Sequence, residues 1–178
     1  MTVLDTVIVG GGQAGLGVSY FLQQNRNSHV VFEQGRIGES WLSARWDSFQ
    51  LNTPNVRNVL PGLPYDGAEA DGFWRTDKLV DYFQRYVDRF QLPVRTGVTV
   101  ISVERAEDQA GFVVKTRRQD QAEESVVSRS VVVASGIQRI PKIPALRSKL
   151  PAEILQLHTS AYRNPESLPP GAVLVVGG

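Results

Sequence analysis

Cysteine is absent from this chain of 178 residues, and its absence excludes several chemistries at once. Without thiols, this stretch forms no disulfide, no thiolate nucleophile and no cysteine-based metal site. Histidine is scarce as well, because His29 and His158 are the two in the sequence and lie far apart along it. Two isolated imidazoles make a poor metal site, so we expect none.

An excess of charge of one sign is also lacking, since the net charge at pH 7 is +1. No basic cluster alternates with aromatic residues, which argues against a nucleic-acid partner. No apolar run approaches the roughly 18 residues of a transmembrane helix, and the N-terminus leads into a β-rich run without a signal-peptide pattern. The sequence therefore predicts a cytoplasmic protein with no membrane span.

What the sequence does contain is a glycine-rich turn after its first β-branched run, in VIVGGGQAG. Gly10, Gly12 and Gly15 fit G-x-G-x-x-G, in which the glycines make a tight turn, admit a pyrophosphate and let a helix pack on the sheet. A helical segment and the run HVVFE follow, and the run predicts a second parallel strand that ends on Glu33. A carboxylate there accepts hydrogen bonds from a ribose diol and disfavours the 2′-phosphate of NADP at this first site. The alternative is a phosphate-free α/β turn followed by a solvated Glu33.

The segment from Gly35 to Thr76 has little periodicity and holds all three tryptophans. A loop this long and aromatic inside a compact domain is either functional or a hydrophobic flap over the core. Both interpretations stay open at this point.

A helix and three short strands are predicted next. Apolar residues recur at helical spacing over 79–90, with Thr76 or Asp77 as the N-cap and Gln91 to Pro93 at the end. The runs 98–103, 112–116 and 126–134, with a polar turn at 107–111 between the first two, suit an antiparallel meander. The last run continues into VVVASG without alternation, which indicates a central strand covered on both faces.

Four motifs in order carry a family resemblance: VIVGGGQAGLG, FEQGRIGESW, VVVASGIQRIPKIP and LHTSAYRNP. They resemble the N-terminal half of the flavin-containing monooxygenases, including bacterial flavoprotein members, over essentially the whole chain. The resemblance implies an α/β FAD-binding domain at 1–150, a Rossmann-like fold with a parallel central sheet and a three-stranded antiparallel meander. It implies that 151–178 is an interdomain segment and the first strand, AVLVVGG, of an NADPH-binding domain. On this interpretation the chain is truncated, because the rest of both domains would follow.

The resemblance also implies residue roles. Glu33 would hold the adenosine ribose with Gln34 beside it, Trp41 would lie along the flavin, and Val100 would meet the adenine. Glu39 stands where the family has a second glycine before this tryptophan. The FAD pyrophosphate would be held by Gly10, Gly12, Gln13, Ala14 and Gly15. The family's Ala-Thr-Gly is matched by Ala134, Ser135 and Gly136.

Asn52 and Thr53 match an Asn-Thr pair that the family places near the isoalloxazine ring, which makes Asn52 the candidate catalytic residue. A side-chain amide can donate to a developing oxygen anion, and such donors are worth about 3 kcal/mol in acyl-transfer enzymes. The alternative is an Asx-turn before Pro54. His158 matches a family histidine expected to form interdomain hydrogen bonds. Tyr162, where Baeyer-Villiger members have tryptophan, resembles the nitrogen- and sulfur-oxygenating members.

The predicted function is therefore that of an FAD-binding oxidoreductase, an NADPH-dependent monooxygenase of a small nitrogen or sulfur nucleophile in its complete form. The site for NADPH would lie mostly outside this sequence. A disulfide reductase shares several of these motifs, but it needs a redox cysteine pair shortly after Glu33, and the chain has no cysteine. A non-catalytic FAD- or ADP-binding module is the other alternative. It would act through self-association or a partner chain that covers exposed strand edges and apolar surface.

Overall fold

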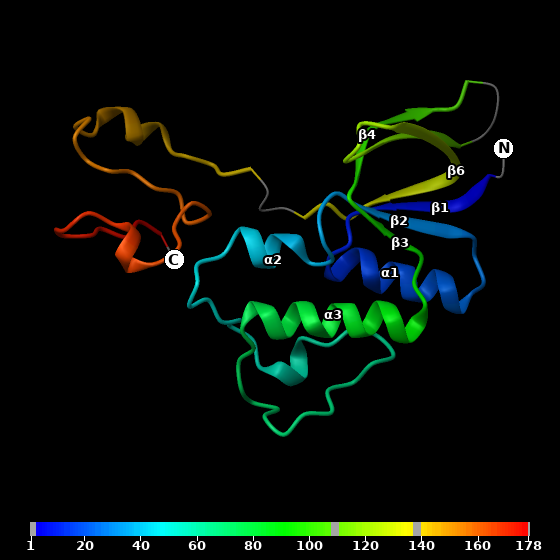
Figure 1. Cartoon of the computed structure of the whole chain (residues 1–178), viewed down its shortest axis with the longest axis horizontal. Helices are drawn as coiled ribbons and strands as arrows, with labels where there is room; N and C mark the ends of the chain where they lie inside the picture. The colour runs from blue at the N-terminus through cyan, green and yellow to red at the C-terminus, as the bar shows by residue number, and fades with distance from the viewer. Residues whose placement is uncertain (1–2, 108–110, 137–139, 178) are drawn as a thin grey trace.

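The computed structural model describes residues 3–107, 111–136 and 140–177 of the chain. Its body is one six-stranded sheet in the order β3-β2-β1-β6-β5-β4, with helices packed against it (Figure 1). β1, β2, β3 and the end of β6 pair in parallel, and β4, β5 and the start of β6 form an antiparallel meander. The strands are β1 (Leu4–Val9), β2 (His29–Glu33), β3 (Val94–Thr96), β4 (Val98–Arg105), β5 (Phe112–Arg118) and β6 (Glu123–Val133). The predicted α/β fold class, with a parallel central sheet and a three-stranded meander, is confirmed.

The first unit is the βαβ crossover that the sequence predicts. β1 leads through the glycine turn into α1 (Gln13–Gln24), and α1 returns to β2, which lies parallel to β1. The central residues of β1 and the whole of β2 are buried, which explains why both read as continuous apolar runs without alternation. The carboxyl ends of these strands therefore meet at one edge of the sheet.

Helices α1 and α3 (Thr76–Phe90) lie on one side of the parallel strands. The apolar stripe of α3 packs into a core cluster that also receives Ile37, Leu51 and Leu60 from the long loop. That loop thus covers the core in part, as a hydrophobic flap would. It also contains two short elements that the sequence did not predict, α2 (Glu39–Ser43) and a 3-10 turn at Asn55–Arg57.

The meander curls over the opposite face of the parallel strands. Val7 of β1 and Phe32 of β2 are buried there against Val114 of β5, and Val98 and Val100 of β4 pack around them. The parallel strands thus have the helices on one side and the meander on the other. Among the described residues, no helix is both long and apolar enough to cross a membrane.

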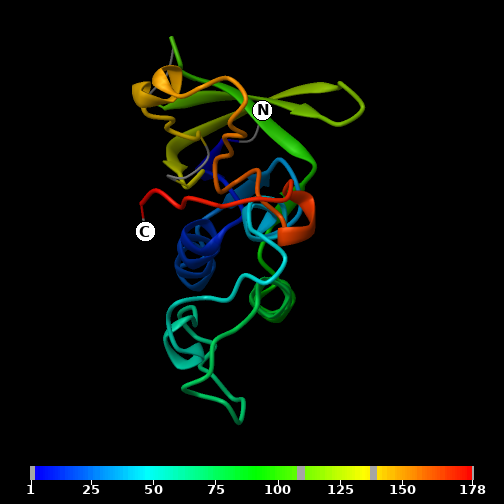
Figure 2. The same cartoon turned by 90° about the vertical axis from the view of Figure 1, so that its left-hand side faces the viewer.

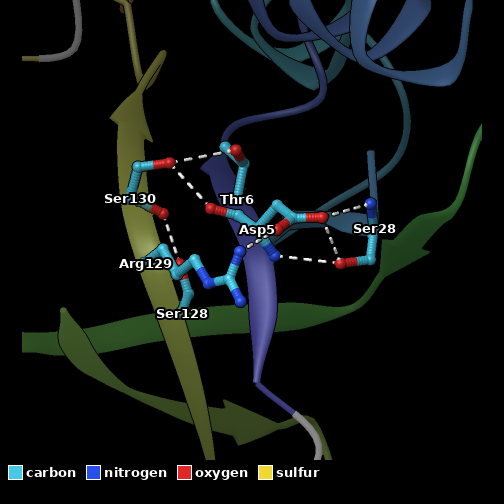
Figure 3. A network of polar contacts seen from close by, with 6 residues as sticks. All are labelled: Asp5, Thr6, Ser28, Ser128, Arg129 and Ser130. Carbon is cyan, nitrogen blue, oxygen red and sulfur yellow. Dashed lines mark hydrogen bonds and ion pairs between the residues drawn. The ribbon is translucent and has the colours of Figure 1, made fainter. Parts of the chain in front are cut away.

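A network of hydrogen bonds and one ion pair lies at the end of the sheet where β1 begins (Figure 3). The Asp5 carboxylate accepts hydrogen bonds from the Ser28 N–H at 2.9 Å and the Ser28 hydroxyl at 2.7 Å, and pairs with Arg129 at 3.1 Å. The Ser130 hydroxyl donates to the Asp5 carbonyl at 2.8 Å and lies 3.0 Å from the Thr6 hydroxyl. The bonds from Ser28 hold the pKa of Asp5 below its ordinary value. These contacts join β1 to both of its neighbours at the end opposite the glycine turn.

The region around α3 differs from the prediction in two places. β3 was not predicted, because Val94–Thr96 is too short to show a pattern and becomes a strand only by pairing with β2. The expected cap is wrong as well. The N-cap is Arg75 with no side-chain cap bond, and Thr76 is the first helical residue. The predicted end is confirmed, since Gln91 adopts the left-handed conformation at the C-cap.

The end of β6 is less covered than expected. Val131 and Val132 are half-buried and Val133 is 73% exposed, so the prediction that this run is covered on both faces is wrong. The reason lies in the pairing, because β5 reaches only as far as Ser128 and the stretch beyond it pairs with β1 alone. Parts of the 107–111 turn and of the VVVASGIQRIPKIP motif, namely 108–110 and 137–139, lie outside the described residues.

The expected C-terminal strand does not form. Residues 172–177 have no regular secondary structure, and the side chains from Val173 to Val176 are 66–86% exposed. A parallel strand exists only when a neighbour pairs with its backbone groups, and this run has no such neighbour among the described residues. The last residue, Gly178, lies outside the described part of the chain.

The glycine turn gives a first prediction. A Cβ on Gly15 would lie 2.0 Å from the Gly10 carbonyl oxygen, whereas a Cβ on Gly17 would meet nothing within 4 Å. We expect Gly15→Ala to lower the free energy of unfolding by about 3 kcal/mol or more, because backbone must move. The matched control Gly17→Ala should raise it by up to about 1 kcal/mol through helix propensity. Denaturant unfolding of both variants checks this, and equal stabilities would contradict it.

Tyr82 gives a second prediction. Its hydroxyl accepts from the buried Leu60 N–H at 2.7 Å and donates to the Leu63 carbonyl at 2.7 Å, which ties the long loop to α3. Tyr82→Phe leaves a buried N–H unpaired and should cost about 1–3 kcal/mol of unfolding free energy. Tyr65→Phe is the control, because its hydroxyl accepts an exposed bond from Glu69, and it should change stability by no more than about 0.5 kcal/mol. Thermal melts that fail to separate the two variants would contradict this.

Candidate cofactor-binding site

Two of the three motif glycines are required by the chain's own packing. Gly10 has φ +112°, and a Cβ on it would lie 2.4 Å from the carbonyl oxygen of Ala134 at the end of β6. Gly15 brings the first turn of α1 against the Gly10 carbonyl, where a Cβ would lie 2.0 Å from the oxygen. These close approaches set where α1 begins relative to the sheet edge.

Gly12 is different, because neither its conformation nor its surroundings require a glycine. Its φ is −92°, which any residue adopts, and a Cβ on it would meet nothing within 4 Å. The space that a side chain would fill is therefore open, directly in front of the N-terminus of α1. Open space at this position of the motif, in front of a helix N-terminus, is what the approach of a pyrophosphate requires.

The first turn of α1 supplies donors to that space. The first N–H groups of a helix have no partner within the helix, and Gly12 at the N-cap has no side chain to accept from them. Gln13 and Ala14, which open the helix, are exposed. The helix dipole adds partial positive charge at the same place. This arrangement binds anions such as phosphate.

Glu33 lies beside the turn at the end of β2 and is 8% exposed, so the alternative of a solvated carboxylate is wrong. Its Oε2 accepts from the Gly11 N–H at 2.7 Å and its Oε1 from the Gly35 N–H at 2.8 Å. A carboxylate has about four lone-pair directions, so capacity remains for two hydroxyl donors such as those of a ribose. Gln34, the next residue, is exposed beside it.

The sequence analysis missed Gly11 and Gly35, which orient the Glu33 carboxylate. A Cβ on Gly11 would lie 3.0 Å from the Glu33 Cβ. The middle glycine of the GGG run was the signal for this contact, since the G-x-G-x-x-G motif leaves that position free.

The Ala134 to Gly136 stretch lies next to the glycine turn, as its predicted role requires. The Ala134 N–H donates to the Val9 carbonyl at 2.8 Å, and Ser135 and Gly136 are exposed beyond it. Val100 is half-buried and packs against the cluster under the meander. Its contact with an adenine stays a prediction.

The residues expected near the flavin lie on the long loop. Trp41 on α2 is half-buried, and the Arg45 guanidinium lies 5.0 Å from its ring centroid and 5.4 Å from that of Phe49. Asn52 and Thr53 are exposed, and the Thr53 hydroxyl donates to Asn58. The Asx-turn alternative for Asn52 has no donor, because such a turn uses the N–H two residues on and that residue is Pro54. The role of Asn52 toward a flavin stays a prediction.

Among the described residues, no group of three or more histidine, aspartate or glutamate side chains gathers in a way that could hold a metal ion. The elements at the sheet edge are an open glycine turn, a helix N-terminus and a buried carboxylate. This combination is typical of dinucleotide-binding α/β domains.

Comparison with known proteins assigns the chain to a family. The family model described as pyridine nucleotide-disulphide oxidoreductase matches residues 7–178. The chain belongs to this family, and the resemblance to the flavin-containing monooxygenases seen in the motifs is confirmed by its relatives and structural neighbours.

Two relatives illustrate the match. An uncharacterised oxidoreductase, CzcO, from Bacillus subtilis is 36% identical over 98% of this chain and 48% of its own length. A probable indole-3-pyruvate monooxygenase from Arabidopsis thaliana is 32% identical over 97% of this chain and 45% of its own length. The chain thus spans about half the length of the curated relatives it matches.

Solved structures agree with the fold. A flavin-containing monooxygenase from Stenotrophomonas maltophilia has a TM-score of 0.73 and 25% identity, over 93% of this chain and 48% of that one. A bacillithiol disulfide reductase from Bacillus cereus has a TM-score of 0.70 and 20% identity, over 83% of this chain and 45% of that one, which shows a shared fold alone.

Gly12 gives a third prediction. Gly12→Ala puts a methyl group into the open space without touching the protein, so the unfolding free energy should change by less than about 1 kcal/mol. The same methyl group obstructs a pyrophosphate, and we expect the affinity for FAD to fall by about tenfold or more, which is about 1.4 kcal/mol. Equilibrium titration with FAD alongside a thermal melt measures both. An unchanged affinity would show that no phosphate approaches this glycine.

Proposed function

We propose that this chain binds FAD as the N-terminal portion of an NADPH-dependent flavin monooxygenase. The observation that carries the proposal is the open space at Gly12, bounded by two glycines that packing requires and by the buried carboxylate of Glu33. The packing of the chain accounts for Gly10 and Gly15 but not for the glycine at position 12. The chemistry of the turn fits a pyrophosphate joined to a ribose.

Each residue has a stated task in this proposal. The N–H groups at the start of α1, from Gln13 and Ala14, donate to the pyrophosphate. Glu33, held by the two backbone bonds from Gly11 and Gly35, accepts from the ribose hydroxyls. The exposed amide of Asn52 donates to an oxygen atom near the flavin ring.

When bound, FAD would supply the redox chemistry of a monooxygenase, in which two electrons from NADPH and one dioxygen place one oxygen atom on the substrate and reduce the other to water. The protein's part is to orient the cofactor and to exclude water. We propose a small nitrogen or sulfur nucleophile as the substrate. The support is Tyr162, which stands where the Baeyer-Villiger type of relative has tryptophan.

Disulfide reduction is a weaker candidate in spite of the family's printed description. That chemistry passes electrons through a pair of thiols, and this sequence contains no cysteine. The shared fold with a disulfide reductase therefore carries no activity over to this chain.

A non-catalytic FAD- or ADP-binding module that acts through a partner chain is the second candidate. It is favoured by the exposed apolar run Val173–Val176 and by the exposed Val133 at the end of β6. Apolar surface of this kind is typical of an interface. A stable monomer under native conditions would argue against this candidate, and a dimer or a hetero-complex would favour it.

The fourth prediction tests the proposal directly. The purified 178-residue protein is incubated with FAD, freed of unbound flavin, and its visible absorbance spectrum is recorded. We expect flavin bands that persist at a stoichiometry near one, and much weaker bands from the Gly12→Ala variant. We also expect little NADPH oxidation, because the chain spans about half the length of its relatives. A colourless wild-type protein would overturn FAD binding by this chain, and rapid NADPH oxidation would overturn the assignment of the NADPH site to residues beyond it.

A further inference from the structure

Two stretches far apart in the sequence meet beside α2, at 43–47 and 163–164. The Arg163 guanidinium donates through Nη1 to the Arg45 carbonyl and through Nη2 to the Ser43 carbonyl. The Asp47 N–H donates to the Arg163 carbonyl at 2.8 Å, and the Asn164 amide donates to the Asp47 carboxylate at 2.6 Å. We call these five residues the Arg163 latch. Figure 2 shows the orange C-terminal segment passing beside the cyan α2.

The latch donates hydrogen bonds to backbone carbonyls that the end of a short helix leaves without a partner. The last carbonyls of any helix have no partner within it, and α2 ends at Ser43 after five residues. A guanidinium is planar, permanently charged and carries several N–H donors in a fixed fork, so it can bridge two neighbouring carbonyls. A positive charge is also favourable at the C-terminal end of a helix. Arg163 therefore caps α2 from a distant part of the chain.

The latch also attaches its segment. The four hydrogen bonds of the latch join described residues of the stretch 140–177 to the body of the protein. The 3-10 turns at Ala145–Lys149 and Pro165–Ser167 bond within the segment itself. The position of the segment against α2 thus depends on Arg163 and its neighbour.

The latch connects to the candidate site through α2. The Arg45 carbonyl accepts from Arg163, while the Arg45 side chain lies over the rings of Trp41 and Phe49. At the other end of α2, the Gly38 N–H donates to the Gly11 carbonyl of the glycine turn at 3.2 Å. A continuous path of contacts therefore runs from Arg163 to the turn that carries Gly12.

We propose that Arg163 is a positioning residue for the FAD site. It holds the C-terminal segment against α2 and thereby fixes Trp41, Arg45 and the turn beside Gly12. This inference rests on the proposed function. Because coupling between two sites is reciprocal, bound FAD in turn strengthens the latch and protects the segment 140–177 from opening.

The fifth prediction compares Arg163→Ala and Arg163→Lys with Arg147→Ala in the full 178-residue chain. Arg147 is the control, since it belongs to the same segment and its side chain makes none of the latch bonds. We expect Arg163→Ala to weaken FAD binding about tenfold, and Arg163→Lys to weaken it less, because one ammonium replaces the fork but keeps the charge. Arg147→Ala should bind FAD as the wild type does.

Two readouts do not depend on FAD. The tryptophan emission of the flavin-free protein comes from Trp41, Trp46 and Trp74, of which the first two lie on or beside the latch stretch, and it should shift in Arg163→Ala but not in Arg147→Ala. Limited proteolysis should cut the segment 140–177 faster in Arg163→Ala, and in the wild type FAD should slow that cleavage. Thermal melts check that each variant remains folded, and Arg163→Lys serves if Arg163→Ala does not.

The outcomes separate the two proposals. Wild-type FAD affinity together with wild-type emission and cleavage in the Arg163 variants overturns the positioning role, even when FAD binds. A wild-type protein that binds no FAD overturns the proposed function. The changes in emission and cleavage then decide, by themselves, whether Arg163 holds the segment against α2.

Discussion

The contact between the first turn of α1 and the end of β1 is the constraint on which the site depends. With Gly15 against the Gly10 carbonyl, the helix starts as close to the sheet edge as backbone allows. Any side chain at this contact would move the helix N-terminus away from the edge, and with it the N–H groups that face the open space at Gly12. The same edge receives Glu33, whose carboxylate is oriented by the Gly11 N–H of that turn. The proposed phosphate donors and the proposed ribose acceptor therefore share one rigid support.

Local pattern was enough to predict much of the fold. The buried strands β1 and β2 read as apolar runs, α1 and α3 as helices, and the meander as three β-rich segments, because each buries a face that its own sequence marks. The glycines and Glu33 were predictable for a related reason, since the chemistry of the turn needs those residue types at that spacing.

Features that depend on distant partners could not be predicted in this way. β3 is a strand only because β2 pairs with it, and the run from Val173 to Val176 is not a strand because no described neighbour pairs with it. The cap of α2 comes from Arg163, 120 residues further along the chain. No local pattern encodes such a contact. The long loop was ambiguous for a similar reason, because its aromatic residues pack on α3 and also lie beside the expected flavin.

β6 carries a consequence for how the chain reaches this structure. Its first half joins a hairpin of local contacts, whereas its second half pairs β1 with residues 128–133. The first strand of the protein thus gains one of its two neighbours only after residue 133 has left the ribosome. Until then β1 has an unpaired edge, and contacts of such large sequence separation form slowly. The nascent chain therefore passes through an interval in which β1, whose central residues are buried in the final structure, still has an unpaired edge, and this interval is when it would be most susceptible to mispairing.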